Sequence, residues 1–560
     1  MKPKIQYMAV IMLWALPLLL TVPNAVLSIT EQYYSIAARI ANVALPAGIY
    51  LLIAAWSRRI GRTALLMIPL MVLCAFQIVL IFLYGESIIA IDMFLNVVTT
   101  NVHEASELLR NLGPAIAVVC ALYLPLIIGG IVLCVKRCHT TLPQRRAARM
   151  AGIGLSAVGA AAFAVSFAMP GGYRPERELF PVNVCYNMGV ASCRTVQAKE
   201  YGNTSADFTF DAVAGSTGPE VVVLVVGETT RADNWQLNGY GRPTNPKLSG
   251  RRHLVSYKKA LSESNTTHKS VPLLMSHLDA ASFGDSIYEV KSVITAFGEA
   301  GYRTAWISNQ QRNGSLIDFF GEEADSVRFL ADEPGPHYDM DIIPHLSRII
   351  SADSTERTFV VLHTYGSHFN YTERYPQKFA AFTPDRNMNA EKNNRSELVN
   401  AYDNTVRYID SMLDSVISVL AGSGRPAAML YLTDHGEDIF DDSRCRFLHA
   451  SPTPTYWQLH VPVLLWLSDE YVAEYPERYA AARANECADV SSSRSAFHTL
   501  LSLGNVGTPF FDASADLTSG SYRLPARLYL TDYNEAAPLG RAGLGDPDYA
   551  KLAEAGISVQ

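Results

Sequence analysis

Five apolar stretches, each about as long as a bilayer-spanning helix, fill the first 170 residues of this 560-residue chain. They cover residues 7–28, 39–56, 63–84, 113–135 and 150–169. A helix needs about 20 mainly apolar residues to cross the hydrocarbon core of a bilayer. One such stretch alone could be a buried core helix, but five with almost no internal charge predict five transmembrane helices. The first stretch is too long for a cleaved signal peptide and is followed by further spans, so we expect it to remain as an anchor.

The charges of the connecting segments predict how these spans are oriented. Basic residues gather before the first span, between spans two and three, and between spans four and five: Lys2, Lys4, Arg58, Arg59, Arg62, Lys136, Arg137, Arg145, Arg146 and Arg149. The alternate loops carry mostly acidic residues: Glu31, Glu86, Asp92, Glu104 and Glu107. Because basic loops stay on the cytoplasmic side, we expect a cytoplasmic N-terminus and residues 171–560 on the outer face of the membrane.

The remainder of the chain has the composition of an acidic soluble domain. Residues 171–560 hold 34 basic and 48 acidic side chains, against 12 and 5 in residues 1–170. A nucleic-acid binder is disfavoured, because phosphate contacts need clustered Lys and Arg. An aromatic content of 10% also argues against disorder.

The pattern of apolar runs predicts the domain organisation. We expect a transmembrane domain at 1–169, a linker and interfacial segment at 170–218, and an outward-facing α/β domain at 219–560. Within the last of these, fully apolar β-rich runs alternate with helical segments, at 220–226, 303–308, 358–363, 427–433 and 461–467. Such runs are typical of parallel strands that are buried on both faces, so we expect an α/β doubly wound sheet.

Polar clusters follow four of these strands directly. They are Gly227-Glu228-Thr229-Thr230, Asn309-Gln310-Gln311, Gly366-Ser367-His368 and Asp434-His435-Gly436-Glu437. Ligands of open parallel sheets bind outside the carboxyl ends of the strands, so we expect the clusters to converge. Carboxylate and imidazole side chains suit a divalent metal. A turn with a helix cap would explain Asp434-His435 alone, and Glu228 at a second strand end favours the metal site.

A further polar loop runs into an apolar helix at 264–274. We expect the helix to carry Pro272 in its first turn. The N–H groups at a helix start can receive a phosphate, and Thr267 lies at that start. The alternative is a simple N-cap without catalytic meaning.

In combination, these motifs resemble a known family. The order G-E-T-T-R-A-D, T-T-x-x-S-V-P, G-S-H, T-D-H-G-E and L-H is similar to the membrane phosphoethanolamine transferases of Gram-negative bacteria, within the alkaline phosphatase and sulfatase superfamily. The resemblance covers nearly the whole chain, because that family also has five spans before a periplasmic catalytic domain. It implies an inner-membrane protein, one Zn²⁺ ion and a possible second.

The resemblance also implies roles for individual residues. Glu228, Thr267, Asp434 and His435 would bind zinc, with Thr267 as the nucleophile. His368 and His449 would lie near the phosphoryl group or a second zinc and could move protons; without the family they would be interpreted as structural. The donor would be phosphatidylethanolamine and the acceptor lipopolysaccharide, either lipid A or core sugar. We expect a monomer.

Two further groups of residues are predicted to contact substrate. Asn96, Thr100 and Glu104 are spaced four apart and would share one helix face, in a segment similar to the family's substrate-contacting segment. The alternative is a solvated interfacial helix. Head-group contacts are assigned to Asn309, Gln310, Gln311 and Ser315. Tyr402-Asp403-Asn404 also matches a family motif, but its helical context indicates packing or capping.

The sequence departs from the lipid A-modifying branch at two positions. Asn265 and Leu273 stand where that branch usually has cysteines, and the motif is closer to relatives that modify core sugars. A sulfatase would need an Arg after the Val-Pro, which is absent here. Phosphoglycerol transferases differ in the lipid donor and remain an alternative, as does a catalytically inactive binding module.

Four cysteines lie in the part predicted to face an oxidising compartment. We hypothesise that Cys185 pairs with Cys193 and that Cys445 pairs with Cys487. Cys74, Cys120, Cys134 and Cys138 lie in spans or a cytoplasmic loop, where packing is the expected role.

Overall fold

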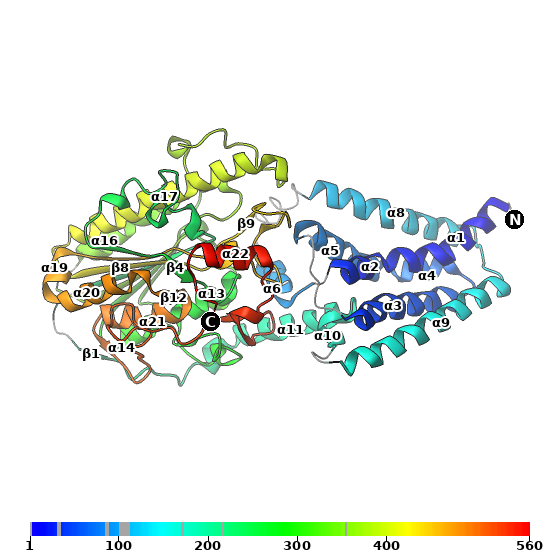
Figure 1. Ribbon diagram of the computed structural model, residues 1–560, viewed down its shortest axis with the longest axis horizontal. Coiled ribbons are helices and arrows are strands. Elements are labelled where there is room, and N and C mark those ends of the chain that lie inside the picture. Colours follow the sequence, from blue (N-terminus) through cyan, green and yellow to red (C-terminus); the bar gives the residue numbers. More distant parts are fainter. Residues whose placement is uncertain are drawn as a thin grey trace. The chain divides into compact units, whose positions relative to one another are not determined.

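The computed structural model describes residues 3–30, 35–84, 89–99, 112–169, 173–215, 218, 220–335, 337–352 and 355–559. The chain forms two compact units, the first extending to Ser192 and the second beginning at Cys193 (Figure 1). This division falls within helix α11 (Val182–Lys199), inside the segment that the sequence suggests as a linker.

The described part of the first unit is helical. Its helices are α1 (Pro3–Leu20), α2 (Val22–Thr30), α3 (Ile36–Trp56), α4 (Ile60–Leu66), α5 (Ile68–Tyr84), α6 (Ile91–Thr99), α8 (Gly113–Val135), α9 (Leu142–Phe167), α10 (Pro175–Glu178) and the start of α11. Four helical segments among the described residues are long and apolar enough to cross a membrane: Gln6–Ile29, Ile36–Trp56, Gly113–Val135 and Leu142–Phe167. Helices α4 and α5 pass the same test only together and are bent by 53°, so the count is four, or five if this pair is one span.

Glycines set the close packing of these helices. A Cβ atom on Gly48 of α3 would lie 2.4 Å from Ser156 Oγ of α9, and one on Gly159 of α9 would lie 2.5 Å from the backbone nitrogen of Leu45. Small residues let helix backbones approach in lipid, where burial of apolar surface gives no driving force. The pairing of α3 with α9 therefore depends on the absence of side chains at these positions.

The second unit is built around a seven-stranded mixed sheet with the order β3-β11-β8-β2-β7-β5-β6. Its strands are β2 (Val221–Gly227), β3 (Leu254–Tyr257), β5 (Arg303–Ser308), β6 (Ser326–Phe329), β7 (Thr358–His363), β8 (Ala427–Thr433) and β11 (Val463–Leu467). Strand β2 is central because it is apolar at nearly every position and buried on both faces, and it pairs in parallel with β7 and β8. Strand β11 pairs antiparallel with β8 and β3, so the expectation of a parallel strand there is wrong.

Short strands lie outside this sheet. They are β1 (Val213–Ala214), β4 (Lys259–Leu261), β9 (Asp438–Ile439), β10 (Phe447–Leu448), β12 (Asp489–Ser491), β13 (Val506–Gly507), β14 (Leu528–Leu530) and β15 (Ala536–Pro538). They form two-stranded pairs: β1 with β13, β9 with β10, β4 with β12, and β14 with β15.

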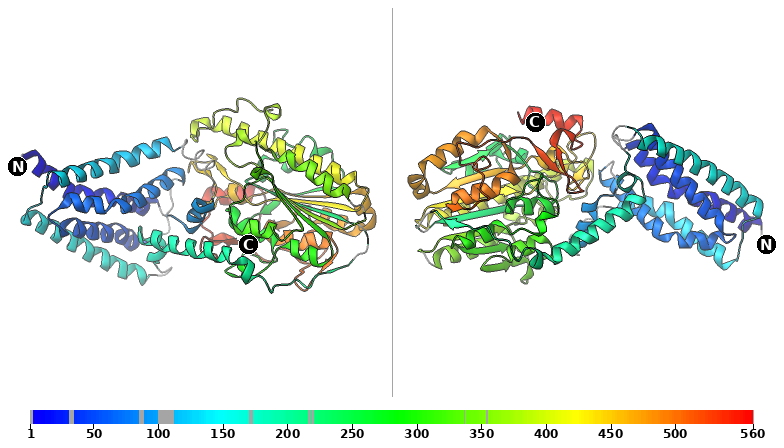
Figure 2. Two further views of the ribbon diagram at one scale, coloured as in Figure 1. Left: turned by 180° about the vertical axis from the view of Figure 1, so that it is seen from behind. Right: turned by 90° about the horizontal axis from the view of Figure 1, so that it is seen from below.

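Helices cover both faces of the large sheet, as Figures 1 and 2 show. One face packs against α16 (Ile343–Ala352) and α17 (Arg395–Ala421). The other packs against α13 (Thr267–Met275), α14 (Val293–Glu299), α15 (Leu316–Gly321) and α21 (Ser492–Leu503). The remaining helices are α12 (Tyr201–Thr204), α18 (Tyr456–Leu459), α19 (Asp469–Glu474), α20 (Pro476–Ala484) and α22 (Asp546–Glu554). Alternate residues of β2 point into the two layers, which gives the unit two cores.

The structure contradicts both suggested disulfides, because all eight cysteines are free. Cys185 and Cys193 lie on one helix, α11, and a rise of about 1.5 Å per residue puts their Cα atoms about 12 Å apart. A disulfide needs Cα atoms within about 7 Å of each other. Cys445 and Cys487 are also unpaired.

Candidate metal centre and active site

The polar clusters that follow β2 and β8 meet at the carboxyl edge of the sheet. Among the described residues, one group of acidic and imidazole side chains could hold a metal ion: Glu228, Asp434 and His435, with ligand atoms within 4.8 Å of one another. All three residues are buried. Burial raises the pKa of Asp434 to about 6, and it lowers the pKa of His435 well below its usual value.

The hydrogen bonds of His435 identify its tautomer. Its Nδ1 lies 2.9 Å from the carbonyl oxygen of Gly436, which can only accept, so Nδ1 carries the proton. The lone pair on Nε2 then faces Asp434 Oδ2 at 3.2 Å and Glu228 Oε1 at 3.7 Å. Three electron-rich atoms therefore point at one another, an arrangement that a cation between them would stabilise.

Thr267 completes this group from a third element. It is the first residue of α13, and its Oγ1 lies 3.1 Å from His435 Nε2 and 3.3 Å from Glu228 Oε1. Thr267 therefore lies at the start of the helix, where the sequence suggested it, but Pro272 lies in the second turn and not in the first. The hydroxyl is thus held at the amino end of a helix, where the N–H groups and the helix dipole favour an anion.

The donor set fits a zinc ion. Asp434 Oδ2 is buried and accepts no hydrogen bond, so one carboxylate oxygen is available. Ligands about 2.0–2.1 Å from a tetrahedral zinc stand about 3.3–3.4 Å apart. The separations of Thr267, His435, Asp434 and Glu228 given above are close to that value. Carboxylate, imidazole and hydroxyl groups are all suitable donors.

Unusual backbone conformations fix the two carboxylates. Thr229 has a φ of 55°, rare for a β-branched residue, and its N–H donates to Asp434 Oδ1 at 3.0 Å. Its hydroxyl donates to Glu228 Oε1 at 2.7 Å. Gly366 also has a φ of 55°, and a Cβ there would lie 2.4 Å from the carbonyl oxygen of Glu228. Only glycine fits at that position without displacing Glu228.

The other two predicted catalytic histidines lie beside this group. The ring of His449 is centred 4.1 Å from that of His435, and the ring of His368 is centred 6.1 Å from that of His449. Both side chains are partly exposed. His449 Nδ1 also lies 3.9 Å from the carboxylate of Glu437, which is buried. The two imidazoles therefore stand between the buried group and the surface.

The predicted head-group residues have different surroundings. Gln310 contacts the site, because its Nε2 donates to Glu228 Oε2 at 3.3 Å and to the carbonyl oxygen of Thr364 at 2.8 Å. Asn309 is buried, and its Nδ2 donates to Asp339 Oδ1 at 2.8 Å. Gln311 is exposed. Ser315 precedes α15, and its hydroxyl is buried without a hydrogen bond.

The residues assigned to the loop between spans three and four are mostly outside the described residues. Thr100 and Glu104 are not described, and Asn96 lies in α6 with its side chain not described. Their proposed contact with substrate therefore stays a prediction.

Two further residues hold the site in place: Tyr402, whose motif the sequence assigned to packing or capping, and Asp339, which sequence reasoning missed. Tyr402 on α17 donates its hydroxyl to the carbonyl oxygen of Thr229 at 2.8 Å and accepts from the N–H of Arg231 at 2.8 Å, which fixes the loop after β2. Asp339 accepts from the N–H groups of Tyr365 at 2.8 Å and Gly366 at 2.9 Å. Asp339 belongs to none of the sequence motifs, because the segment that it positions lies 26–27 residues further along the chain.

Asn265 anchors the loop that carries Thr267. Its Nδ2 donates to the carbonyl oxygen of Ser451 at 2.8 Å and to Gln458 Oε1 at 2.6 Å, and its Oδ1 accepts from Tyr529 at 2.8 Å. The side chain is 1% exposed, so these bonds are shielded from water. A buried amide thus fixes the loop at a position where the resemblance would have suggested a cysteine.

Comparison with known proteins identifies the family of the chain. The family model for sulfatases matches residues 220–506, which include the sheet and the group around Thr267. The chain belongs to the sulfatase family. This sulfatase-family chain is 31% identical over 307 residues to phosphoethanolamine transferase EptA of Escherichia coli K12, an alignment that covers 53% of this chain and 55% of that protein. The chain thus spans about half the length of that curated relative.

Solved structures of related proteins share the fold. The integral membrane lipooligosaccharide phosphoethanolamine transferase A of Neisseria meningitidis aligns with a TM-score of 0.68 at 20% identity, over 90% of this chain and 97% of that one. The zinc complex of the C-terminal periplasmic domain of EptC from E. coli aligns with a TM-score of 0.52 at 22% identity, over 58% and 94% of the two chains. The predicted fold class, apolar helices followed by an alkaline phosphatase-like domain, is confirmed.

Proposed function

We propose that this sulfatase-family protein transfers phosphoethanolamine from phosphatidylethanolamine to a lipopolysaccharide acceptor, through a covalent intermediate on Thr267. The observation that carries the proposal is the position of the Thr267 hydroxyl, 3.1–3.3 Å from a buried imidazole and a buried carboxylate. The name of the EptA relative supports phosphoethanolamine as the group transferred. The name of the Neisseria structure supports a lipooligosaccharide acceptor.

In the first half-reaction, Thr267 Oγ1 attacks the phosphorus of the donor. A Thr267 Oγ–phosphorus bond forms, and the bond from phosphorus to the diacylglycerol oxygen breaks. Thr267 gives up its proton, and the departing diacylglycerol oxygen takes one up. The N–H groups at the start of α13 face the charge on the phosphoryl oxygens.

In the second half-reaction, an acceptor oxygen attacks the phosphorus and releases Thr267 Oγ. The acceptor loses a proton, and Thr267 regains one. His368 and His449 are the partly exposed imidazoles beside the site, so we assign to them proton transfer to the leaving group and from the acceptor. Donor and acceptor occupy the same site in turn, which gives ping-pong kinetics.

Glu228, Asp434, His435 and Thr267 would hold zinc in this proposal. When bound, the metal lowers the pKa of a coordinated oxygen and neutralises charge on the phosphoryl group. Gln310 and Thr229 hold Glu228, and the N–H groups of Thr229 and His435 hold Asp434. These contacts keep the carboxylates in position before any substrate arrives.

The proposed substrates explain the membrane unit. Phosphatidylethanolamine and lipopolysaccharide are both amphiphiles, so an anchored catalytic unit meets them at a raised effective concentration. We place the protein in the bacterial inner membrane with the N-terminus in the cytoplasm and the second unit in the periplasm. Fusion of an alkaline phosphatase reporter tests this orientation. The reporter should be active when fused to the C-terminus and inactive when fused within the loop at 136–141.

Labelled donors test the reaction. The purified full chain is incubated separately with phosphatidylethanolamine and phosphatidylglycerol labelled in the head group, and peptides are analysed for label on Thr267. We expect label from phosphatidylethanolamine only. Label from phosphatidylglycerol alone would instead indicate a phosphoglycerol transferase, and label from neither would exclude the covalent mechanism.

The acceptor is tested in cells. Mass spectrometry compares lipid A and core oligosaccharide from cells with the protein, without it, and with its Thr267→Ala variant. We expect phosphoethanolamine to be gained by one of the two fractions, and only with the unaltered protein. No gain in either fraction would exclude lipopolysaccharide as the acceptor.

A further inference from the structure

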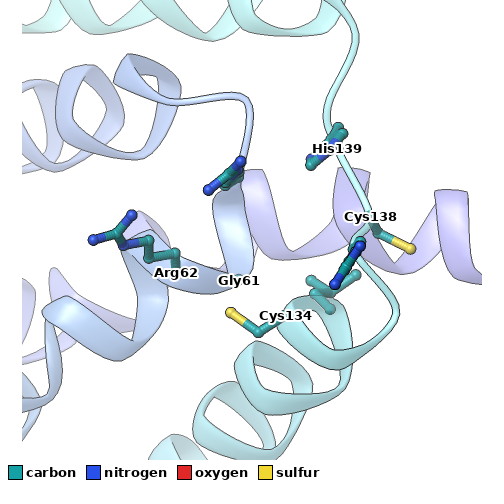
Figure 3. Close-up of a pocket in the computed structure, with 8 residues that line it drawn as sticks. Gly61, Arg62, Cys134, Cys138 and His139 are labelled. Carbon is teal, nitrogen blue, oxygen red and sulfur yellow. The ribbon is translucent and has the colours of Figure 1, made fainter.

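A basic cavity lies at one end of the membrane-spanning helices, in the first unit. Its volume is about 370 Å³, and its lining consists of Arg59, Gly61, Arg62, Leu133, Cys134, Arg137, Cys138 and His139. Figure 3 shows Arg62 on one helix, Cys134 on a neighbouring helix, and Cys138 and His139 on the segment that follows the latter. Two turns that are far apart in the sequence thus build the cavity, the one before α4 and the one after α8.

The packing of α4 against α8 brings these turns together. A Cβ on Gly61 would lie 2.7 Å from the carbonyl oxygen of Gly130, so the two helices touch through their backbones. The two turns are also joined directly, because the N–H of Thr140 donates to the carbonyl oxygen of Arg58 at 2.9 Å. The cavity is therefore a fixed part of the fold.

The chain supplies no negative charge to this cavity. Residues 1–30, 35–85 and 108–175, which include all of α1 to α5, α8 and α9, contain neither Asp nor Glu. His139 Nδ1 is buried there and has no hydrogen-bond partner. The positive-inside rule accounts for basic residues in these two loops, but it does not require three guanidinium groups to converge on one cavity.

We propose that this cavity binds the phosphate head group of an anionic phospholipid. Arginine recognises phosphate because its guanidinium presents a planar fork of donors. Exposed apolar side chains occur close in sequence to the lining residues: Trp56, three residues before Arg59, is 81% exposed, and Val135, next to Cys134, is 71% exposed. These surfaces can take the acyl chains and the interfacial region of a lipid, which a free phosphate ion would leave uncovered.

This site is independent of the proposed transfer reaction. None of its residues belongs to the second unit, which contains Thr267 and its neighbours. In the predicted orientation it faces the cytoplasmic leaflet, whose anionic lipids attract basic groups near the membrane surface. We infer a structural lipid, bound at the opposite face from the catalytic unit's substrates.

Native mass spectrometry of the full chain in detergent tests the proposal. The protein is titrated with phosphatidylglycerol, phosphatidylcholine or inorganic phosphate, and bound adducts are counted. Arg62→Gln and Arg137→Gln should each weaken phosphatidylglycerol binding about fivefold, since one basic group near a membrane surface contributes that much. The matched control is Arg146→Gln, an exposed arginine of α9 that does not line the cavity, which should leave binding unchanged.

Three results would overturn the proposal. They are equal phosphatidylglycerol binding by the cavity variants and the control, equal binding of phosphatidylcholine, and binding of inorganic phosphate without binding of phosphatidylglycerol. If a cavity variant fails to fold, a photoactivatable phosphatidylglycerol is cross-linked to the unaltered protein. Cross-links should map to α4 or to 136–141, and their absence from both segments would also refute the site.

Discussion

The two units each contain a group of charged side chains whose composition indicates the ligand. In the second unit, the buried carboxylates of Glu228 and Asp434 face an imidazole that burial keeps neutral. In the first unit, three arginines line a cavity whose surrounding helices carry no carboxylate. The first group favours a cation and the second an anion, although both occur in one chain.

The difference between the two groups lies in how rigidly they are held. Thr229, Gln310 and the N–H of His435 fix the carboxylates by hydrogen bonds at 2.7–3.3 Å. The guanidinium groups of the cavity have no ion-pair partner among the described residues and remain exposed. A catalytic site needs its groups positioned before substrate arrives, whereas a lipid head group can be met by long, adaptable side chains.

Removal of the nucleophile should have the largest effect. Thr267→Ala is expected to lower phosphoethanolamine transfer at least about a thousandfold, because the hydroxyl proposed to form the covalent intermediate is lost. Thr267→Ser keeps the hydroxyl and should retain measurable activity. The measurement is transfer from labelled phosphatidylethanolamine, and an active Thr267→Ala protein would remove this residue from the mechanism.

Removal of one carboxylate tests whether the buried group attracts a cation. Asp434→Asn keeps an oxygen that accepts from the N–H of Thr229, but it loses the negative charge. Loss of a residue that only supports a ligand lowers metal affinity by up to about a hundredfold, so loss of a ligand should lower zinc affinity by more than that. Elemental analysis of the purified protein gives the metal content. Arg62→Gln, in the cavity of the first unit, is the control and should leave zinc unchanged. Unaltered zinc in Asp434→Asn would refute its role as a ligand.

The rigid positioning of the carboxylates can be tested at Gly366. Gly366→Ala should lower the free energy of unfolding by about 3 kcal/mol. The new Cβ would clash with the backbone of Glu228, and a positive φ adds strain for alanine. Gly424→Ala is a matched control, since Gly424 has a φ of 63° and open space around its Cβ position. Thermal unfolding should show a larger loss for Gly366→Ala. Equal losses would show that the contact with Glu228 is unimportant.

The smallest expected effect concerns Glu263, a buried carboxylate outside the metal group. Burial raises the pKa of Glu263 from 4.5 to about 7, while Ser491 and the N–H of Ala280 donate to it. The folded state therefore holds the proton on Glu263 more tightly than the unfolded state does. The stability that protonated Glu263 contributes is complete below pH 4.5 and is lost as the pH rises through 7.

Glu263→Gln should remove that loss. Relative to the unaltered protein, the variant should gain about 2–3 kcal/mol of stability between pH 5 and pH 8. Unfolding temperatures measured across this pH range test the sign. A difference that stays constant with pH would show that Glu263 remains ionised in the folded protein.

Much of the fold follows from local patterns in the sequence. The apolar runs at 220–226, 303–308, 358–363 and 427–433 become neighbouring parallel strands, because continuous burial requires the centre of a sheet. The run at 461–467 is equally apolar, yet it pairs antiparallel. Whether a strand runs parallel or antiparallel to its neighbours depends on the chain that connects them, so it cannot be predicted from the composition of the strand.

The convergence of Glu228, Thr267, Asp434 and His435 follows from the strand-end rule and from the resemblance to a family. Their roles as ligands stay predictions. Tyr402 belongs to a motif that the sequence assigned to packing or capping, and it holds the loop after β2. Asp339 could not be found in this way, because it acts through contacts with a segment 26–27 residues further along the chain. The proposed pairing of Cys185 with Cys193 failed for a related reason: spacing alone does not reveal that one continuous helix contains both.

The buried amide of Asn265 has a consequence for how the protein matures. Because hydrogen bonds, and no sulfur–sulfur link, secure the segment bearing Thr267, that segment needs no thiol oxidation to reach its working shape. The loop that carries Thr267 can therefore reach its folded conformation in a reducing or an oxidising compartment, and mild reductants such as dithiothreitol should leave it intact.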